Sequence, residues 1–184
     1  FRGDQSAPVQ HISLHGLTFT HAARTFMENK EPLLRSDWTT YRGGAIVIEG
    51  GEDIALTNLW LDEVGSNGIF INNYNRRVEI TSCHIENAGA SSIAFVGDPS
   101  AVRSPLFQYA QKADYEDIDT RRGPKGTNFP AECLVENCLL VRNGRFEKQT
   151  AGVNISMSMH ISIRHNSIYD VPRAGINICD GTWG

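Results

Sequence analysis

Five segments of the chain share one short apolar pattern, and this repetition constrains the fold more than any other feature. The shared motif is an alternating stretch of four residues that begins at Ala45, Gly68, Ser92, Gly152 and Gly175. The first three starts are 23 and 24 residues apart and the last two are 23 apart, whereas 60 residues separate the third from the fourth. The long interval is one period plus an insertion of about 36 residues. Self-similarity at such a period is the signature of a repeat architecture.

Further apolar columns run through the same units. One column contains Ile12, Ile54, Val78, Cys133 and Ile161, a second contains Leu14, Leu56, Ile80, Val135 and Ile163, and a third contains Phe19, Leu61, Ile85, Leu140 and Ile168. The runs are short, rich in Ile, Val and Leu, and separated by Gly and Asn, which favours strands over helices. We therefore predict an all-β chain that folds as a parallel β-helix (a β-solenoid) of about five coils, with two or three strands of four to five residues in each coil.

The length of 184 residues and the hydrophobic content of 40% are compatible with a single domain over residues 1–184. Residues 21–43 and 97–131 interrupt the period, so we predict that they are long insertions that loop out of the stack. The sequence begins within a coil and ends without a capping segment, and we expect it to be a fragment of a longer catalytic module.

The composition argues against several classes of partner. A net charge of −4 gives no reason to expect nucleic acid or an anionic membrane, and no apolar run is long enough to span a bilayer. The cysteine spacings match no zinc pattern, and we predict neither a metal site nor a cofactor. Cys83 and Cys138 occupy one column on adjacent coils, where they are either small buried apolar residues or close enough for a disulfide.

Alternation predicts which side chains of the repeated strand point outward. On the later units these include Asn154, Ser156 and Asn177, a polar row suited to sugar hydroxyls. One insertion enters this sheet and the other leaves it, so we expect them to wall a groove over its outer face. Candidate substrate-binding residues are Asn154, Asn177, Lys148, Trp38, Tyr41, Arg103 and Trp183. The two tryptophans could instead be core or cap residues.

Carboxylates near the strand ends are the candidate catalytic groups. Asp98 and Asp180 follow equivalent strands two coils apart, about 10 Å before loop adjustment, and Glu147 precedes another strand beside Lys148. A glycosidase needs two carboxyl groups roughly 5 to 5.5 Å apart when it is retaining and 6.5 to 9.5 Å apart when it is inverting. Each candidate has a structural alternative: Asp98 and Asp180 as turn residues, and Glu147 as an ion-pair partner of Lys148.

Several longer segments resemble a known family. They are Pro-Leu-Leu-Arg-Ser-Asp-Trp-Thr-Thr-Tyr-Arg-Gly-Gly-Ala at residues 32–45, Asn-Asn-Tyr-Asn-Arg-Arg-Val at 72–78, Phe-Val-Gly-Asp-Pro-Ser-Ala-Val-Arg at 95–103, Phe-Glu-Lys-Gln-Thr-Ala-Gly-Val at 146–153 and Tyr-Asp-Val-Pro-Arg-Ala-Gly-Ile-Asn-Ile at 169–178, followed by Asp-Gly-Thr-Trp-Gly. Together they resemble the right-handed parallel β-helix proteins of glycoside hydrolase family 141, which include α-L-fucosidase and xylanase activities. The resemblance implies a bacterial, secreted or periplasmic enzyme that hydrolyses plant cell-wall polysaccharide with two acidic side chains. Asp180 is the favoured member of the pair, with Asp98 or Glu147 as its companion, although the second acid could also lie beyond Gly184.

Two other functions remain open from the sequence. A polysaccharide lyase would use a basic residue such as Lys148 or Arg173, often with calcium, for which the acidic residues between Asp114 and Asp119 could provide ligands. A solenoid that binds carbohydrate without cleaving it is the non-catalytic alternative.

Overall fold

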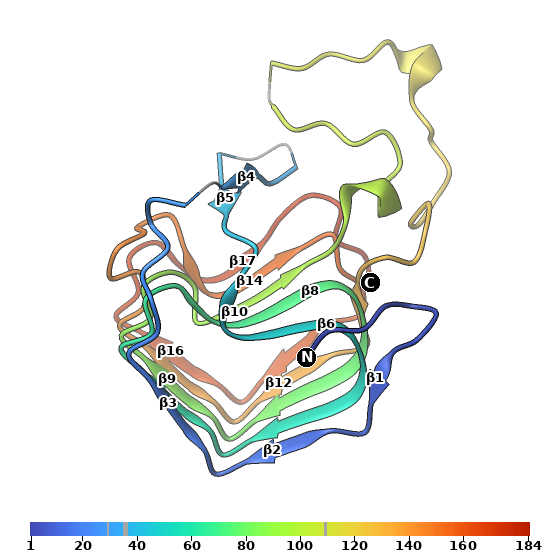
Figure 1. Ribbon diagram of the computed structural model, residues 1–184. Coiled ribbons are helices and arrows are strands. Elements are labelled where there is room, and N and C mark those ends of the chain that lie inside the picture. The colour runs from blue at the N-terminus through green and yellow to red at the C-terminus, as the bar shows by residue number, and fades with distance from the viewer. Residues whose placement is uncertain (29, 35–36, 109) are drawn as a thin grey trace.

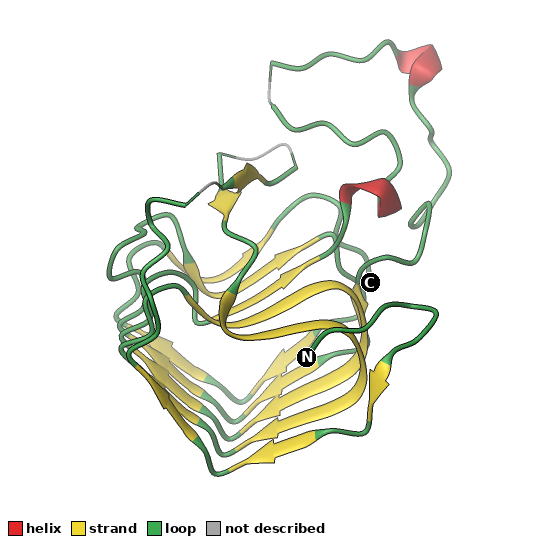
Figure 2. Ribbon diagram, viewed as in Figure 1, coloured by secondary structure: helices red, strands yellow, loops and turns green. Residues whose placement is uncertain are grey.

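The computed structural model describes residues 1–28, 30–34, 37–108 and 110–184. Asn29, Arg35 and Ser36 of the first insertion and Tyr109 of the second lie outside these ranges. The described chain consists almost entirely of strands and loops (Figure 2). The strands are β1 (Val9–Gln10), β2 (Ser13–His15), β3 (Thr18–Thr20), β4 (Glu31–Pro32), β5 (Thr39–Thr40), β6 (Gly44–Thr57), β7 (Trp60–Asp62), β8 (Asn67–Thr81), β9 (His84–Glu86), β10 (Ile93–Val96), β11 (Pro130–Ala131), β12 (Leu134–Glu136), β13 (Leu139–Val141), β14 (Ala151–Ser156), β15 (Ser162–Arg164), β16 (Ser167–Tyr169) and β17 (Ala174–Ile178). The second insertion contains the short 3-10 helices η1 (Pro99–Ala101) and η2 (Tyr115–Asp117).

Most of these strands belong to two parallel sheets. The described strands form a ten-stranded sheet whose main path runs β1-β6-β8-β10-β14-β17, and a five-stranded sheet in the order β16-β13-β9-β7-β3. Figure 1 shows the successive strands of each sheet lying side by side along the molecule. The first insertion adds the small antiparallel pair β4 and β5.

The predicted register of the apolar columns is confirmed by the strand pairing. Ile46 pairs with Ile69 and Ile69 with Ile93, and further along the sheet Ile93 pairs with Val153 and Val153 with Ile176. Left-handed backbone residues also recur between strands at equivalent places, for example Gly16, Asn58, Ser82, Asn137 and His165, with φ between 54° and 67°. Each provides a sharp local turn, and Gly and Asn tolerate this conformation best.

The predicted fold class, a right-handed parallel β-helix of about five coils, is corrected by the structure. The described strands form broad multi-strand parallel sheets, and their pairing does not define a closed solenoid. The expectation of two or three strands of four to five residues in each coil is wrong for the units that contain β6 and β8, which run continuously for 14 and 15 residues. The sequence pattern divided each of them in two.

Hydrogen bonds of Asn75 explain why these strands are continuous. The register between β6 and β8 shifts between Glu49 and Gly51. Asn75 is fully buried there: its Oδ1 accepts from the Gly51 amide at 2.9 Å, and its Nδ2 donates to the carbonyls of Asn72 at 2.8 Å and Ile48 at 3.3 Å. One side chain thereby satisfies backbone groups that the irregularity leaves without ladder partners.

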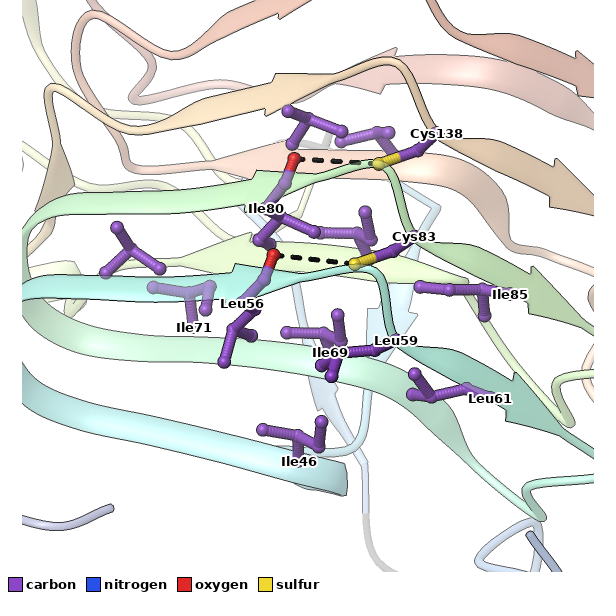
Figure 3. Close-up of a cluster of buried hydrophobic side chains, with 14 of the residues drawn as sticks. Ile46, Leu56, Leu59, Leu61, Ile69, Ile71, Ile80, Cys83, Ile85 and Cys138 are labelled. Atoms are coloured by element: carbon purple, nitrogen blue, oxygen red, sulfur yellow. Dashed lines mark hydrogen bonds between the residues drawn. The ribbon is translucent and has the colours of Figure 1, made fainter. Parts of the chain in front are cut away.

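The main core lies between the sheets. Its members come from both of them and include Ile48, Leu61, Ile71, Ile85 and Phe95, each fully buried. All four cysteines are buried free thiols, so Cys83 and Cys138 are not bonded to each other. Cys83 and Cys138 lie in the turns that follow the paired strands β8 and β12, and Figure 3 shows their thiols side by side. Each thiol donates to a backbone carbonyl at 3.5 Å, that of Leu56 for Cys83 and that of Ile80 for Cys138. No helix in the described ranges is long and apolar enough to cross a membrane.

Candidate functional site

The two insertions meet over the outer face of the large sheet, but they cover it rather than leaving a groove. Leu33, Leu34 and Trp38 of the first insertion form a second buried cluster with the outward-facing Phe70 of β8 and Val96 of β10. Val102 and Phe107 of the second insertion pack against this cluster. Alternation correctly indicated which side chains face outward, but it gave no sign that the insertions would bury them.

Trp38 and Asn154 are therefore poorly accessible. The Trp38 side chain is only 7% exposed, and the Arg173 guanidinium lies 4.9 Å from its ring centroid. Asn154, at 4% exposure, accepts a hydrogen bond of 2.7 Å from Asn177, which is partly exposed and also donates to Cys179 Sγ at 3.0 Å. The predicted polar row exists, but its amides are largely directed at one another.

A small cleft brings together two of the predicted site residues. Asp180 and Arg103 line a cavity of about 180 Å³ between the end of β17 and the second insertion. The remaining lining residues are Leu34, Val102, Ser104, Pro105, Leu106 and Gly181. Asp180 is exposed, so its carboxylate is accessible from solvent. We take this cavity, the Asp180 cleft, as the candidate active site.

Arg103 fixes the wall of the Asp180 cleft. Its guanidinium donates to Asp119 Oδ2 at 2.8 Å and to the carbonyls of Gly123 at 3.1 Å and Pro124 at 2.9 Å. Hydrogen bonds from Arg121 and Arg103 hold the pKa of Asp119 well below its usual range. Arg103 thus ties together distant parts of the insertion and contributes positive charge to the cleft.

Asp98 lies beyond the C-terminal ends of the parallel strands of the large sheet, as Asp180 does. The strands β10, β14 and β17 are parallel neighbours, and Phe95 is level with Ile155 and Ile178. Extending this register places Asp180 level with Gly97, next to Asp98 and two strand spacings away, about 10 Å between backbones. The Asp98 side chain accepts from the Ser100 amide at 2.8 Å and caps η1, which is the turn role that the sequence left open.

Glu147 and Lys148 lie at the opposite, N-terminal ends of the strands, before β14 begins. Glu147 Oε2 pairs with Lys30 Nζ at 3.4 Å, whereas Glu147 Oε1 is buried without a hydrogen-bond partner among the described residues. Lys148 donates to the Gly144 carbonyl at 2.8 Å and does not serve as the partner of Glu147. β14 and its parallel neighbours separate Glu147 from Asp180 by about 17 Å along the strand direction.

The remaining predicted aromatic residues are dispersed. Tyr41 lines a separate cavity of about 310 Å³ with Lys30, Glu31, Thr40 and Arg42. Trp183 packs against Phe129, with ring centroids 5.3 Å apart, at the base of the second insertion. Neither residue lines the Asp180 cleft.

Sequence reasoning missed Arg42, which joins the first insertion to the sheet. Its guanidinium contacts Glu31 at 2.7 Å, Asn72 Oδ1 at 2.6 Å and the Gly97 carbonyl at 2.8 Å. The sequence carried no signal for these contacts, because Arg42 precedes the start of β6 whereas Gly97 follows the end of β10. Within the described ranges, no group of three or more His, Cys, Asp or Glu side chains could hold a metal ion.

Comparison with known proteins gives one informative result. No protein-family model matches the chain, and no curated protein sequence matches it. A solved structure named "Glycoside hydrolase" matches with a TM-score of 0.70 at 15% sequence identity, over 98% of this chain. This chain spans 33% of that one. The chain therefore has a glycoside hydrolase-like fold, and the match does not single out family 141.

Proposed function

We propose that this chain is part of a glycoside hydrolase that acts on plant cell-wall polysaccharide. The observation that supports this proposal best is that Asp98 and Asp180 both lie beyond the C-terminal ends of the strands, with Asp180 exposed in a cleft. The structural neighbour is named a glycoside hydrolase, and its likeness in fold adds support. The fucosidase or xylanase type, and a secreted or periplasmic location, rest on the resemblance of the quoted segments to family 141.

The proposed chemistry uses two carboxyl groups across the scissile bond. Asp180 is the favoured acid or base because it is exposed and lines the cleft, and Asp98 is its companion because it lies at the same edge. A backbone separation of about 10 Å, shortened by the reach of the two side chains, is closer to the inverting range of 6.5 to 9.5 Å than to the retaining range. Glu147 is about 17 Å away along the strands, which is too far to form a pair with Asp180.

The other predicted residues have supporting roles in this proposal. Arg103 positions the wall of the cleft, and Asn177 is the more accessible amide of the polar row. Trp38 and Asn154 support the floor from within, since both are buried. Tyr41, Trp183 and Lys148 lie outside the cleft and would contact only an extended polysaccharide.

The test is replacement of Asp180 by Asn in the full-length protein. Because a positioned acid or base contributes about 10² to 10⁴ in rate, turnover of the responsive plant polysaccharide should fall by that factor with an unchanged unfolding midpoint. Asp98→Asn should show a comparable loss. The matched control is Asp114→Asn: Asp114 is exposed and makes no side-chain capping bond, so activity should persist.

Full activity in Asp180→Asn would remove this residue from the mechanism. Release of an unsaturated product that absorbs in the near ultraviolet would instead identify a lyase. Binding of oligosaccharide without any cleavage by the full-length protein would support the non-catalytic alternative.

A further inference from the structure

A larger cavity lies near the N-terminal ends of the strands of the large sheet, whereas Asp180 lies beyond their C-terminal ends. It has a volume of about 380 Å³ and is lined by residues from the connections that lead into β6, β8, β10 and β14. The lining residues are His21, Ala22, Ala23, Arg24, Glu63, Gly65, Asn87, Arg145 and Phe146. We call it the Arg24 cavity.

The Arg24 cavity is locally basic in a chain whose net charge is −4. Arg24 and Arg145 are both exposed, and neither has an ion pair with a carboxylate within the part of the chain that the structure describes. The carboxylate among the described lining residues, that of Glu63, pairs with His21 Nε2 at 3.1 Å. Two guanidinium groups therefore remain available for an anionic ligand.

Both arginines are held in place by neutral contacts. The Arg24 guanidinium lies 4.5 Å from the centroid of the Phe146 ring, and Arg145 Nη1 donates to Asn87 Oδ1 at 3.0 Å. A guanidinium has five N–H donors, so each arginine keeps several donors free. This arrangement reduces the side-chain entropy that a ligand would otherwise have to remove.

Exposed apolar surface adjoins the two charges. Phe146 and Phe26 are 40% and 47% exposed, and their ring centroids are 6.2 Å apart. Exposed aromatic rings pack with their faces against the C–H faces of sugar rings, because the aromatic face is electron-rich. An anion without an apolar face, such as a free phosphate, would leave this surface unused.

A second cavity continues from the first. It has a volume of about 320 Å³, shares Asn87 and Arg145 with the Arg24 cavity, and adds Arg142 and Lys148. Arg142 is neutralised by Glu86, whereas Lys148 makes its described contact with a neutral carbonyl. The Asp170 carboxylate also lines this second cavity, where Arg145 and Lys148 are the cations without an ion pair among the described residues. Together the two cavities offer room for more than one sugar unit.

We propose that the Arg24 cavity binds a uronic acid residue of an acidic polysaccharide. The sugar carboxylate lies between Arg24 and Arg145, and the C–H face of the ring contacts Phe146 and Phe26. The second hydrogen of Asn87 Nδ2 donates to a sugar hydroxyl oxygen, because Asn87 Oδ1 already accepts from Arg142 and Arg145, and Glu63 accepts from a hydroxyl group. Glu63 favours a ligand that carries one charge together with hydroxyl donors over a densely charged polyanion, which it would repel.

The experiment measures binding rather than turnover, so it is independent of the proposed hydrolysis. Full-length protein with Asp180→Asn is titrated calorimetrically with tri-galacturonic acid and with its methyl ester, which lacks the negative charge. We expect the acid to bind at least tenfold more tightly, with affinity that falls as salt rises. Arg24→Gln and Arg145→Gln should each weaken binding of the acid at least tenfold at an unchanged unfolding midpoint.

Arg164→Gln is the matched control, because Arg164 is exposed on β15 and pairs with Glu136 at 2.8 Å. The affinity of this variant for the acid should equal that of the Asp180→Asn protein in which every arginine is intact. Equal binding of acid and ester, no binding of either, or insensitivity to both cavity substitutions would overturn the proposal. Competition by inorganic sulfate at concentrations similar to those of the trisaccharide would indicate a simple anion site and would also overturn it. None of these outcomes affects the Asp180 turnover test.

Discussion

Replacement of Phe70 by Ala tests whether the outer face of the large sheet is buried. Phe70 lies on β8 and is fully buried beneath Leu33, Leu34 and Trp38 of the first insertion. If the face were an open groove, as the sequence suggested, the ring would be exposed and its loss would change stability by less than about 0.5 kcal/mol. The structure predicts a much larger effect.

The expected destabilisation is that of a large-to-small core substitution. A buried Phe→Ala change costs about 3 to 5 kcal/mol, because transfer energy is lost and a cavity remains. That is roughly a 150- to 4,000-fold shift of the unfolding equilibrium, at about 1.4 kcal/mol for each factor of ten. With a urea dependence of about 2 to 3 kcal/mol per molar, the unfolding midpoint should fall by about 1 to 2.5 M.

The urea measurement has two controls, one at a buried side chain and one at an exposed side chain. Ile69→Ala removes a fully buried inward side chain next to Phe70 and should cost about 2 to 5 kcal/mol. Ile178→Ala removes a side chain that is 67% exposed and should cost about 0.5 kcal/mol or less. A Phe70→Ala midpoint that matches the Ile178→Ala midpoint would refute the buried outer face.

Three further predictions concern single side chains. Asp119 has a lowered pKa, so its contribution to stability is present above the unfolded value of about 4 and is lost as pH falls through the folded value. The Lys125 amide, which donates to the Ala101 carbonyl at 2.7 Å in the same insertion, should therefore lose hydrogen-exchange protection at low pH, measured relative to the intrinsic exchange rate at each pH. In Asp119→Asn this protection should be low at every pH, and full protection in that variant would contradict the reasoning. Burial raises the pKa of Cys133 to about 12, so at pH 8 only about one thiol in ten thousand is ionised, and mass spectrometry should show iodoacetamide labelling only after unfolding; native labelling at the unfolded rate would contradict this. Asn75→Ala leaves the Gly51 amide and the Asn72 carbonyl unpaired and should lower the free energy of unfolding, measured in urea, by at least about 2 kcal/mol. An unchanged free energy would show that Asn75 does not stabilise the register shift between β6 and β8.

The apolar columns could be read from the sequence because they depend on local geometry. Alternation along a strand fixes which side chains share a face, and the period aligns Ile46, Ile69, Ile93, Val153 and Ile176 in one row. The same register predicted that Asp98 and Asp180 lie at the same ends of their strands. These predictions needed no knowledge of the insertions.

The tertiary structure decided how the columns are joined and what covers them. Asn75 bonds to Gly51 across the sheet and makes β6 and β8 continuous, so the short strands of the expected β-helix are replaced by broad parallel sheets. Trp38 becomes a core residue because the first insertion folds back onto Phe70, and Arg103 meets Asp180 because its guanidinium anchors the second insertion. These contacts join residues far apart in sequence, and their geometry depends on aperiodic loops, whereas the alternation of a strand is set by its own backbone.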